Sequence, residues 1–249
     1  PSSTEIAMYD SMMPILFPGN VQEVIDLGRI GFELSRYSGL WVGFKMVTNV
    51  ADEYSSTEVA PDRVTIHDPG FSYKNKPWQP NQNPNLLTPY TLSIEREIFE
   101  GRMEAARLFG VANQLNKVTL QTADDWIGII AAGKTYYDLR QAFRELDLSD
   151  DDLQHYGIRL MKVSLLAPAD AGVIRDFARG LEEIFVIEEK RAFMNCLFVM
   201  PSTIRQNAPG LSANEMNWIK RWSHSTANSI PMDWRVYWQS DLNGIFLPN

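Results

Sequence analysis

The stretch AAGKTYYD, residues 131–138, places Gly133, Lys134 and Thr135 between an expected strand and an expected helix. Backbone N–H groups at a helix start can hold an anion, so these three residues form a candidate anion-binding site. The GxxxxGK[ST] spacing of a Walker A loop is absent. The alternative interpretation is a tight turn in which Thr135 caps the helix, since such turns are common in α/β units.

Two further polar groups fall near expected strand ends. EEKR, residues 188–191, follows a strand pattern, and the carboxyl ends of parallel strands are where α/β proteins bind ligands. The alternative is a solvated strand end or an inter-domain ion-pair cluster, because charge clusters usually face solvent. SRYSG, residues 35–39, can line a pocket with Lys45 and Thr48, or can simply end a helix beside an outward lysine.

Other catalytic signatures are missing from the sequence. His67, His155 and His224 have no HxxxH or HExxH spacing, so we expect no metal site. Cys196 has no catalytic setting, and GxSxG and a strand-linked GxGxxG are absent. No catalytic residue is therefore assigned.

Composition narrows the class of protein. The 249 residues are 45% hydrophobic and 22% charged, which is typical of one large or two small globular domains. A net charge of −8 argues against nucleic-acid binding. The single cysteine excludes an intramolecular disulfide and an iron–sulfur cluster held by this chain's cysteines alone. No apolar run reaches the roughly 18 residues of a membrane span and no signal peptide is visible, so we expect a cytoplasmic protein. The initial Pro in place of Met is typical of a fragment or a processed end.

The elements that must position these residues begin with a strand, a helix and a strand. Residues 12–19 form an apolar run closed by Pro-Gly, and Asn20 is a plausible N-cap for a helix that ends at Gly39. The nearly continuous apolar run over 40–50 predicts a strand buried on both faces. This order indicates a βαβ unit with a parallel sheet. The predicted inner face of the helix consists of Val21, Val24, Ile25, Gly28, Phe32 and Ser35.

Later segments divide the chain further. RVTI, residues 63–66, can be a short strand. Residues 68–89 are rich in Pro, Asn and Gln, which predicts an extended segment that crosses the surface between two domains. A helix is predicted to begin near Ser93. From Trp126 to Arg191 the pattern is strand, helix, strand, helix, strand, with Pro168 ending the second strand. The tail after Arg191 has no convincing period.

Three stretches resemble the indolepyruvate ferredoxin oxidoreductase family, whose members are thiamine-diphosphate-dependent 2-oxoacid:ferredoxin oxidoreductases. They are FPGNVQEVIDLGRIGFELSRYSGLWVGFKMVTNVAD, AARLFGVANQLNKV, and the run from WIGIIAAGKTYYDLRQAFREL through YGIRLMKV to GLEEIFVIEEKR. Together they cover most of residues 10–192. The resemblance implies an α/β fold with the end of a pyrimidine-type thiamine diphosphate domain at 1–67, a linker at 68–92 and a connecting helix at 93–122. A transketolase-C-like βαβαβ domain with a parallel sheet would follow at 123–192, and an irregular tail at 193–249.

The resemblance also implies a parent activity. The family oxidatively decarboxylates arylpyruvates with coenzyme A, using thiamine diphosphate, Mg2+, iron–sulfur clusters and ferredoxin. The residues expected to hold these cofactors are not in this sequence, so no complete cofactor site is expected here and the isolated chain is expected to be inactive. Its partners would be the remaining domains or subunits and, through them, ferredoxin. The alternatives are a non-catalytic binding or subunit-interface module and a small-anion-binding enzyme using Gly133 to Thr135.

The tail permits a separate hypothesis. If one nucleotide were lost within the codon for Met194, the alternative frame would be forced to encode Glu-Leu at Met194 to Cys196. Across Gln206 to Trp218 it permits ERPRLIGKRDEL, which is similar to a family stretch. The tail would then be an out-of-frame translation whose local signals agree on no fold.

Overall fold

An asparagine and a glycine set the limits of helix α2 (Val21–Ser38). The Asn20 side chain accepts a 2.9 Å hydrogen bond from a backbone N–H of the first turn, and Gly39 ends the helix with a φ of 73°. Both residue types are favoured at these positions. The helix joins β1 (Ile15–Leu16) to the parallel strand β2 (Gly43–Phe44), so the predicted strand–helix–strand unit is confirmed.

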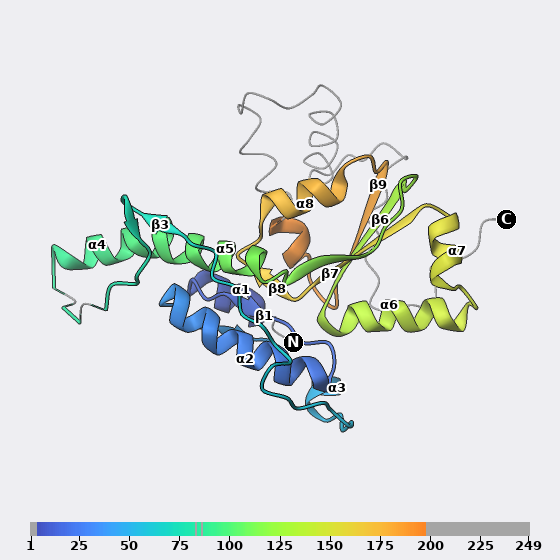
Figure 1. Cartoon of the computed structure of the whole chain (residues 1–249), viewed down its shortest axis with the longest axis horizontal. Coiled ribbons are helices and arrows are strands. Elements are labelled where there is room, and N and C mark those ends of the chain that lie inside the picture. The colour runs from blue at the N-terminus through green and yellow to red at the C-terminus, as the bar shows by residue number, and fades with distance from the viewer. Residues whose placement is uncertain (1–3, 83, 86, 198–249) are drawn as a thin grey trace.

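The computed structural model describes residues 4–82, 84–85 and 87–197 (Figure 1). Early elements besides those above are α1 (Thr4–Asp10), α3 (Thr48–Ala51), β3 (Ser72–Tyr73), β4 (Lys76–Pro77), α4 (Tyr90–Glu97), the π-helical turn η1 (Ile98–Arg102) and α5 (Met103–Ala112). Later elements are β5 (Asn116–Leu120), β6 (Ile127–Ala132), α6 (Gly133–Glu145), α7 (Asp150–His155), β7 (Ile158–Val163), β8 (Leu165–Ala167), α8 (Ala171–Ala178) and β9 (Glu183–Ile187).

The inner face predicted for α2 is wrong. Its buried residues are Leu27, Gly31, Leu34 and Ser38, not the set that starts at Val21. Helix α2 carries two apolar rows, and the one containing Gly31 packs inward, since a Cβ there would lie only 3.2 Å from Leu16. Phe32, of the predicted inner row, is 72% exposed.

Two predicted strands are shorter or absent. The apolar run at 40–50 forms only the two-residue β2, followed by an irregular turn and the short helix α3. Residues 63–66 form no strand. Arg63 instead contacts α2 through a 3.0 Å ion pair with Asp26. Hydrophobicity alone did not distinguish a strand from chain that packs against a helix.

The second half contains a four-stranded sheet in the order β5-β7-β6-β9. Strand β6 pairs in parallel with both β7 and β9, so the predicted α/β class with parallel strands is confirmed. Strand β5, antiparallel to β7, and helix α7 were not predicted as elements. Helix α7 begins at a capping box between Ser149 and Asp152, a signal that the sequence does contain.

One predicted strand divides between two sheets. The chain leaves β7 at Ser164 and enters β8, which pairs antiparallel with β1 in a second sheet of order β2-β1-β8. The Asn116 side chain accepts hydrogen bonds from the backbone N–H groups of Ser164 and Leu165, at 3.0 and 2.9 Å. It therefore satisfies the backbone where the ladder changes partner.

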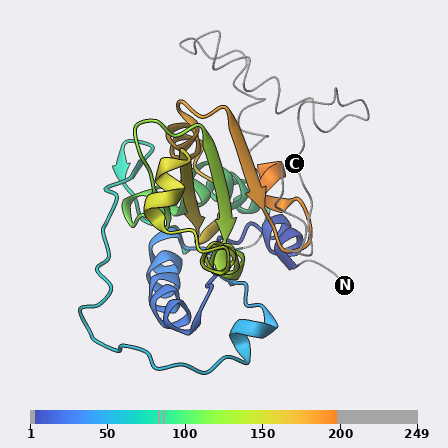
Figure 2. The same ribbon diagram turned by 90° about the vertical axis from the view of Figure 1, so that its right-hand side faces the viewer.

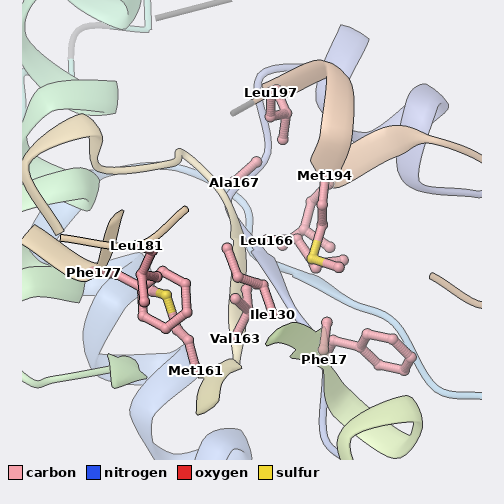
Figure 3. Packing of buried hydrophobic residues seen from close by; sticks show 12 residues of the cluster. Phe17, Ile130, Met161, Val163, Leu166, Ala167, Phe177, Leu181, Met194 and Leu197 are labelled. Atoms are coloured by element: carbon pink, nitrogen blue, oxygen red, sulfur yellow. The ribbon is translucent and has the colours of Figure 1, made fainter. Parts of the chain in front are cut away.

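The four-stranded sheet has a layer on each face (Figures 1 and 2). On one face, Leu160 belongs to a buried cluster with Leu139 and Phe143 of α6. On the other, Met161 belongs to a cluster with Phe177 of α8, as Figure 3 shows. The alternation along β7 is the period of two expected of a strand with both faces covered.

The hydrophobic cluster that contains Met161 and Phe177 also includes residues that are distant in the sequence. It also contains Ile15 and Phe17 near the start of the chain, and Met194 and Leu197 near the end of the described part. Residues 193–197, which begin the tail predicted to be irregular, are helical. The remainder of the tail, from residue 198, lies outside the described residues.

Candidate functional site

A small concavity, open to solvent, lies at the carboxyl ends of β6 and β9. Its wall is made by α1, the residues that follow β1 and β2, the start of α6, and residues 187–194. This is the edge of a parallel sheet where α/β proteins place ligands. It is therefore the candidate site of this chain.

The three residues of the predicted anion site have different surroundings. Gly133 begins α6 with a φ of 49°, and a Cβ there would lie 2.5 Å from the Phe17 ring, which covers this point. Lys134 pairs with Asp138 one turn along. Thr135 is the third residue of the helix, not its N-cap, and it alone of the three lines the concavity.

Lys45 is the central cation of the concavity. Its side chain is 12% exposed, and its ammonium pairs with Glu5 of α1 and, at 3.3 Å, with Glu189 after β9. The ammonium also lies 4.0 Å from the centre of the Phe17 ring, a cation–π arrangement. Lys45 therefore lines a pocket at the strand ends, as the sequence suggested, but its ammonium is paired there with two carboxylates.

The other residues predicted beside Lys45 do not join it. Ser35 donates a 2.8 Å hydrogen bond to the Leu40 carbonyl and so helps to end α2, and Thr48 begins α3. For residues 35–39 the interpretation as a helix end is therefore the one that the structure supports.

The EEKR sequence contributes one buried and several exposed charges. Glu188 accepts hydrogen bonds from the backbone N–H groups of Met194 at 2.6 Å and Asn195 at 3.3 Å, at the start of the helical residues 193–197. Burial raises the pKa of its carboxyl, and the nearby Glu5 acts in the same direction. Lys190 and Glu189 are 3.9 Å apart, so this segment is in part an ion-pair cluster.

Sequence reasoning missed a buried polar cluster behind the concavity. Lys162 of β7 pairs with Glu23 of α2 and lies 3.0 Å from the Tyr137 hydroxyl, which in turn donates to Glu23 at 2.6 Å. Burial lowers the pKa of Lys162 to about 8 and raises that of Tyr137, while the Glu23 carboxylate favours the charged lysine. The available signal was a lysine inside the buried run LMKVSLL.

The remaining candidates show no reactive arrangement. Within the described ranges no group of three His, Cys, Asp or Glu side chains could hold a metal ion, and no helix is long and apolar enough to cross a membrane. Cys196 is exposed. His155 lies against the ring of Tyr156 at 5.7 Å, and His224 lies outside the described residues. In the concavity, Lys45 pairs with both Glu5 and Glu189, so these ion pairs hold α1 and the residues after β2 and β9 together.

Comparison with known proteins finds a family match over the four-stranded sheet. Residues 116–200 match the family model for the indolepyruvate ferredoxin oxidoreductase middle domain, a range that begins with β5 and runs past β9. The chain is related to the indolepyruvate ferredoxin oxidoreductase family. The resemblance of the sequence to this family is thereby confirmed.

The relatives extend the match toward the N-terminal half. Indolepyruvate oxidoreductase subunit IorA of Methanothermobacter marburgensis is 27% identical over 182 residues, which are 73% of this chain and 27% of that protein. The IorA of Methanothermobacter thermautotrophicus is 26% identical over 177 residues, 71% of this chain and 26% of that protein. The chain therefore spans about a quarter of the length of these relatives.

Among solved structures, a 2-oxoglutarate:ferredoxin oxidoreductase from Magnetococcus marinus, with 2-oxoglutarate, coenzyme A and succinyl-CoA bound, aligns with a TM-score of 0.43 and 14% identity. The alignment covers 84% of this chain and 42% of that chain.

The iron–sulfur clusters and the Mg2+ implied by the indolepyruvate ferredoxin oxidoreductase family do not fit the residues of this site. A cysteine-ligated iron–sulfur cluster needs several thiolates, and the sequence has one cysteine. Mg2+ prefers free oxygen ligands, whereas Glu5 and Glu189 are both engaged with Lys45. We therefore derive no catalytic step from a cofactor bound to these residues.

Proposed function

We propose that this chain supplies the middle domain, and the segment that packs against it, of an indolepyruvate-type 2-oxoacid:ferredoxin oxidoreductase. The observation that carries the proposal is the family match over residues 116–200, which coincides with the four-stranded sheet. In the whole enzyme, thiamine diphosphate, Mg2+ and iron–sulfur clusters would be held by other segments. These would decarboxylate an arylpyruvate with coenzyme A and pass electrons to ferredoxin in the cytoplasm.

The role proposed for this chain is to hold neighbouring domains in register. Three separate contacts join residues 1–67, proposed as the end of a pyrimidine-type domain, to the sheet at 123–192. They are the β1–β8 ladder, the ion pair between Glu23 and Lys162, and the shared hydrophobic cluster around Ile15 and Met161. A rigid support of this kind is what positions reacting groups that are held elsewhere. The proposed linker at 68–92 and the segment at 93–122 lie between these two parts in the sequence. The segment expected to be one connecting helix instead contains the end of α4, then η1, α5 and the strand β5.

A chimaera tests this role. The aligned 182 residues of M. marburgensis IorA are replaced by the matching residues of this chain, and arylpyruvate-dependent dye reduction is measured with the partner subunits present. We expect activity above that of an IorA with the segment deleted, and none from the isolated chain. An inactive chimaera, or dye reduction by the isolated chain, would contradict the proposal.

A second candidate function is small-anion binding at the start of α6 by Gly133, Lys134 and Thr135. The observation in its favour is that Thr135 shares the concavity with Arg191, next to the amino end of a helix. Phosphate, coenzyme A and thiamine diphosphate should then each be tried in thermal melts of the chain. A ligand at 100 times its Kd stabilises the folded state by about 2.7 kcal/mol, so an unchanged melting temperature counts against this site.

We also propose that the tail is read out of frame after a nucleotide loss near Met194. The nucleotide sequence of the locus tests this directly. A single restored nucleotide that opens a long frame with a pyrophosphate-binding domain supports it. A frame that stops after Asn249 instead favours the alternative of a non-catalytic binding or subunit-interface module.

A further inference from the structure

Helix α2 has one apolar side that the described part of the chain covers only in part. Ile25, Gly28 and Phe32 follow one another at i, i+3 and i+7, which puts them on one side of a helix. Ile25 is 39% exposed and Phe32 72%. No atom lies within 4 Å of the position a Cβ would take at Gly28, so this side is open at its centre. We call these three residues the open flank.

The other sides of α2 are occupied. The core side packs through Leu27 and Leu34, about a third of a turn away from the open flank. A neighbouring side faces α5, where the rings of Tyr37 and Phe109 are 5.6 Å apart. Nearer the start of the helix, the same side is bridged by the loop after α3, in which Arg63 pairs with Asp26.

Among the described residues, β2 is an edge strand of its sheet, and the open flank lies on that side. Helix α5 is over β8, since a Cβ at Gly110 would lie 2.5 Å from Leu165. In the order β2-β1-β8, the flank of α2 opposite α5 is therefore on the β2 side. Gly43 and Lys45 donate their N–H groups to β1, at 2.7 and 2.8 Å, so the polar groups of Phe44 between them point outward.

The outer edge of β2 and the open flank of α2 lie side by side. In an α/β layer, one further strand and its connected helix would occupy these two positions. One strand would extend the sheet past β2, and the helix connected to it would pack on the open flank, burying both features at once. Gly28 leaves room for that helix to approach closely, and Phe32 supplies the apolar area that it would cover.

We propose that the open flank and the outer edge of β2 bind a strand–helix unit belonging to the rest of an IorA-type polypeptide. The inference rests on the proposed function. A source for the unit exists in that enzyme, because the aligned segment is 27% of the M. marburgensis protein and most of its polypeptide lies outside it. A second copy of this chain is the competing occupant.

Binding in trans tests the proposal. The full 249-residue chain is titrated with M. marburgensis IorA from which the aligned 182 residues are deleted, and the complex is followed by light scattering after size exclusion. Gly28→Leu adds a bulky side chain where no atom lies within 4 Å of the added Cβ, and Phe32→Asp places a charge on the open flank. Both should weaken binding at least tenfold. Leu92→Asp, a matched change at an apolar side chain of α4 that is 63% exposed, should not.

Each other outcome overturns the proposal. The wild-type chain fails to bind, or all variants bind alike, if the flank has no such role. A wild-type dimer that Phe32→Asp dissociates would identify a second copy as the occupant. An active chimaera that tolerates Phe32→Asp would leave the proposed function standing while refuting this inference. Melting temperatures near that of wild type for Gly28→Leu and Phe32→Asp exclude misfolding as the cause.

Discussion

At the scale of single residues, Lys162 joins three elements through one ammonium. It is 6% exposed and pairs with Glu23, while Tyr137 bonds to both. Lys162→Met should destabilise the fold by about 3 kcal/mol, because it leaves the Glu23 carboxylate buried without its countercharge. Urea denaturation would measure the loss. The double variant Lys162→Met/Glu23→Leu should recover most of it, and a double variant as unstable as the sum of the single ones would contradict this account.

Glu188 is a half-buried carboxyl whose ionisation opposes folding. Its pKa is raised in the folded state, so its stabilising contribution is complete below the ordinary value of 4.5 and is lost as the pH rises through the folded-state pKa. Glu188→Gln keeps an acceptor for the Met194 N–H without the charge. It should raise the melting temperature at pH 7 by about 2 °C, with the gain disappearing near pH 4. If the variant melts at a lower temperature than wild type at pH 7, the hydrogen bonds from the Met194 and Asn195 N–H groups to the Glu188 carboxylate stabilise the fold by more than the burial of its charge costs.

Two glycines should respond in opposite ways to alanine. Gly133 has a left-handed φ and faces the Phe17 ring, so Gly133→Ala should cost at least about 2 kcal/mol. Gly28 is helical with open space around it, and Gly28→Ala should stabilise the fold by up to about 1 kcal/mol. Thermal melts of the two variants test both expectations, and equal effects would mean that local space does not govern these positions.

At the scale of elements, the sequence predicted those that local signals specify. Asn20 and Gly39 bound α2 as expected, and the pattern from Trp126 to Ile187 predicted the strands and helices there except α7. The predictions that failed concern features that depend on contacts between residues far apart in the sequence. Which of two apolar rows of α2 faces inward depends on the packing of Gly31 against Leu16, and the division of a single apolar run at Ser164 depends on Asn116.

The candidate site was predictable only in outline. A strand end followed by Gly133 to Thr135, and charges at 188–191, marked the correct edge of the sheet. The sequence did not reveal that Phe17 would cover Gly133, or that Lys45 would be neutralised by Glu5, because these partners lie far apart along the chain. Long-range pairing decided which predicted groups meet.

At the scale of the whole molecule, the two halves should stay associated without a continuous chain between them. Tyr54 is 96% exposed in the loop after α3, so among the described residues brief chymotrypsin treatment should cut there first. The pieces should elute together in native size exclusion, because β1–β8 pairing and the Glu23–Lys162 contact still join them. They should separate in urea. Separation in buffer alone would show that the connecting segment is needed for docking.

The pairing of Ile15 with Ala167 also dictates an order of events during synthesis. At the usual translation rate of about 5–20 residues per second, about 8–30 s pass between the synthesis of β1 and that of its partner β8. During that time the Leu16 side of α2 can be covered by α5, but Ile15 and Phe17 have no cluster to enter. The nascent first segment is thus a natural client for a chaperone that shields apolar chain until residue 167 emerges.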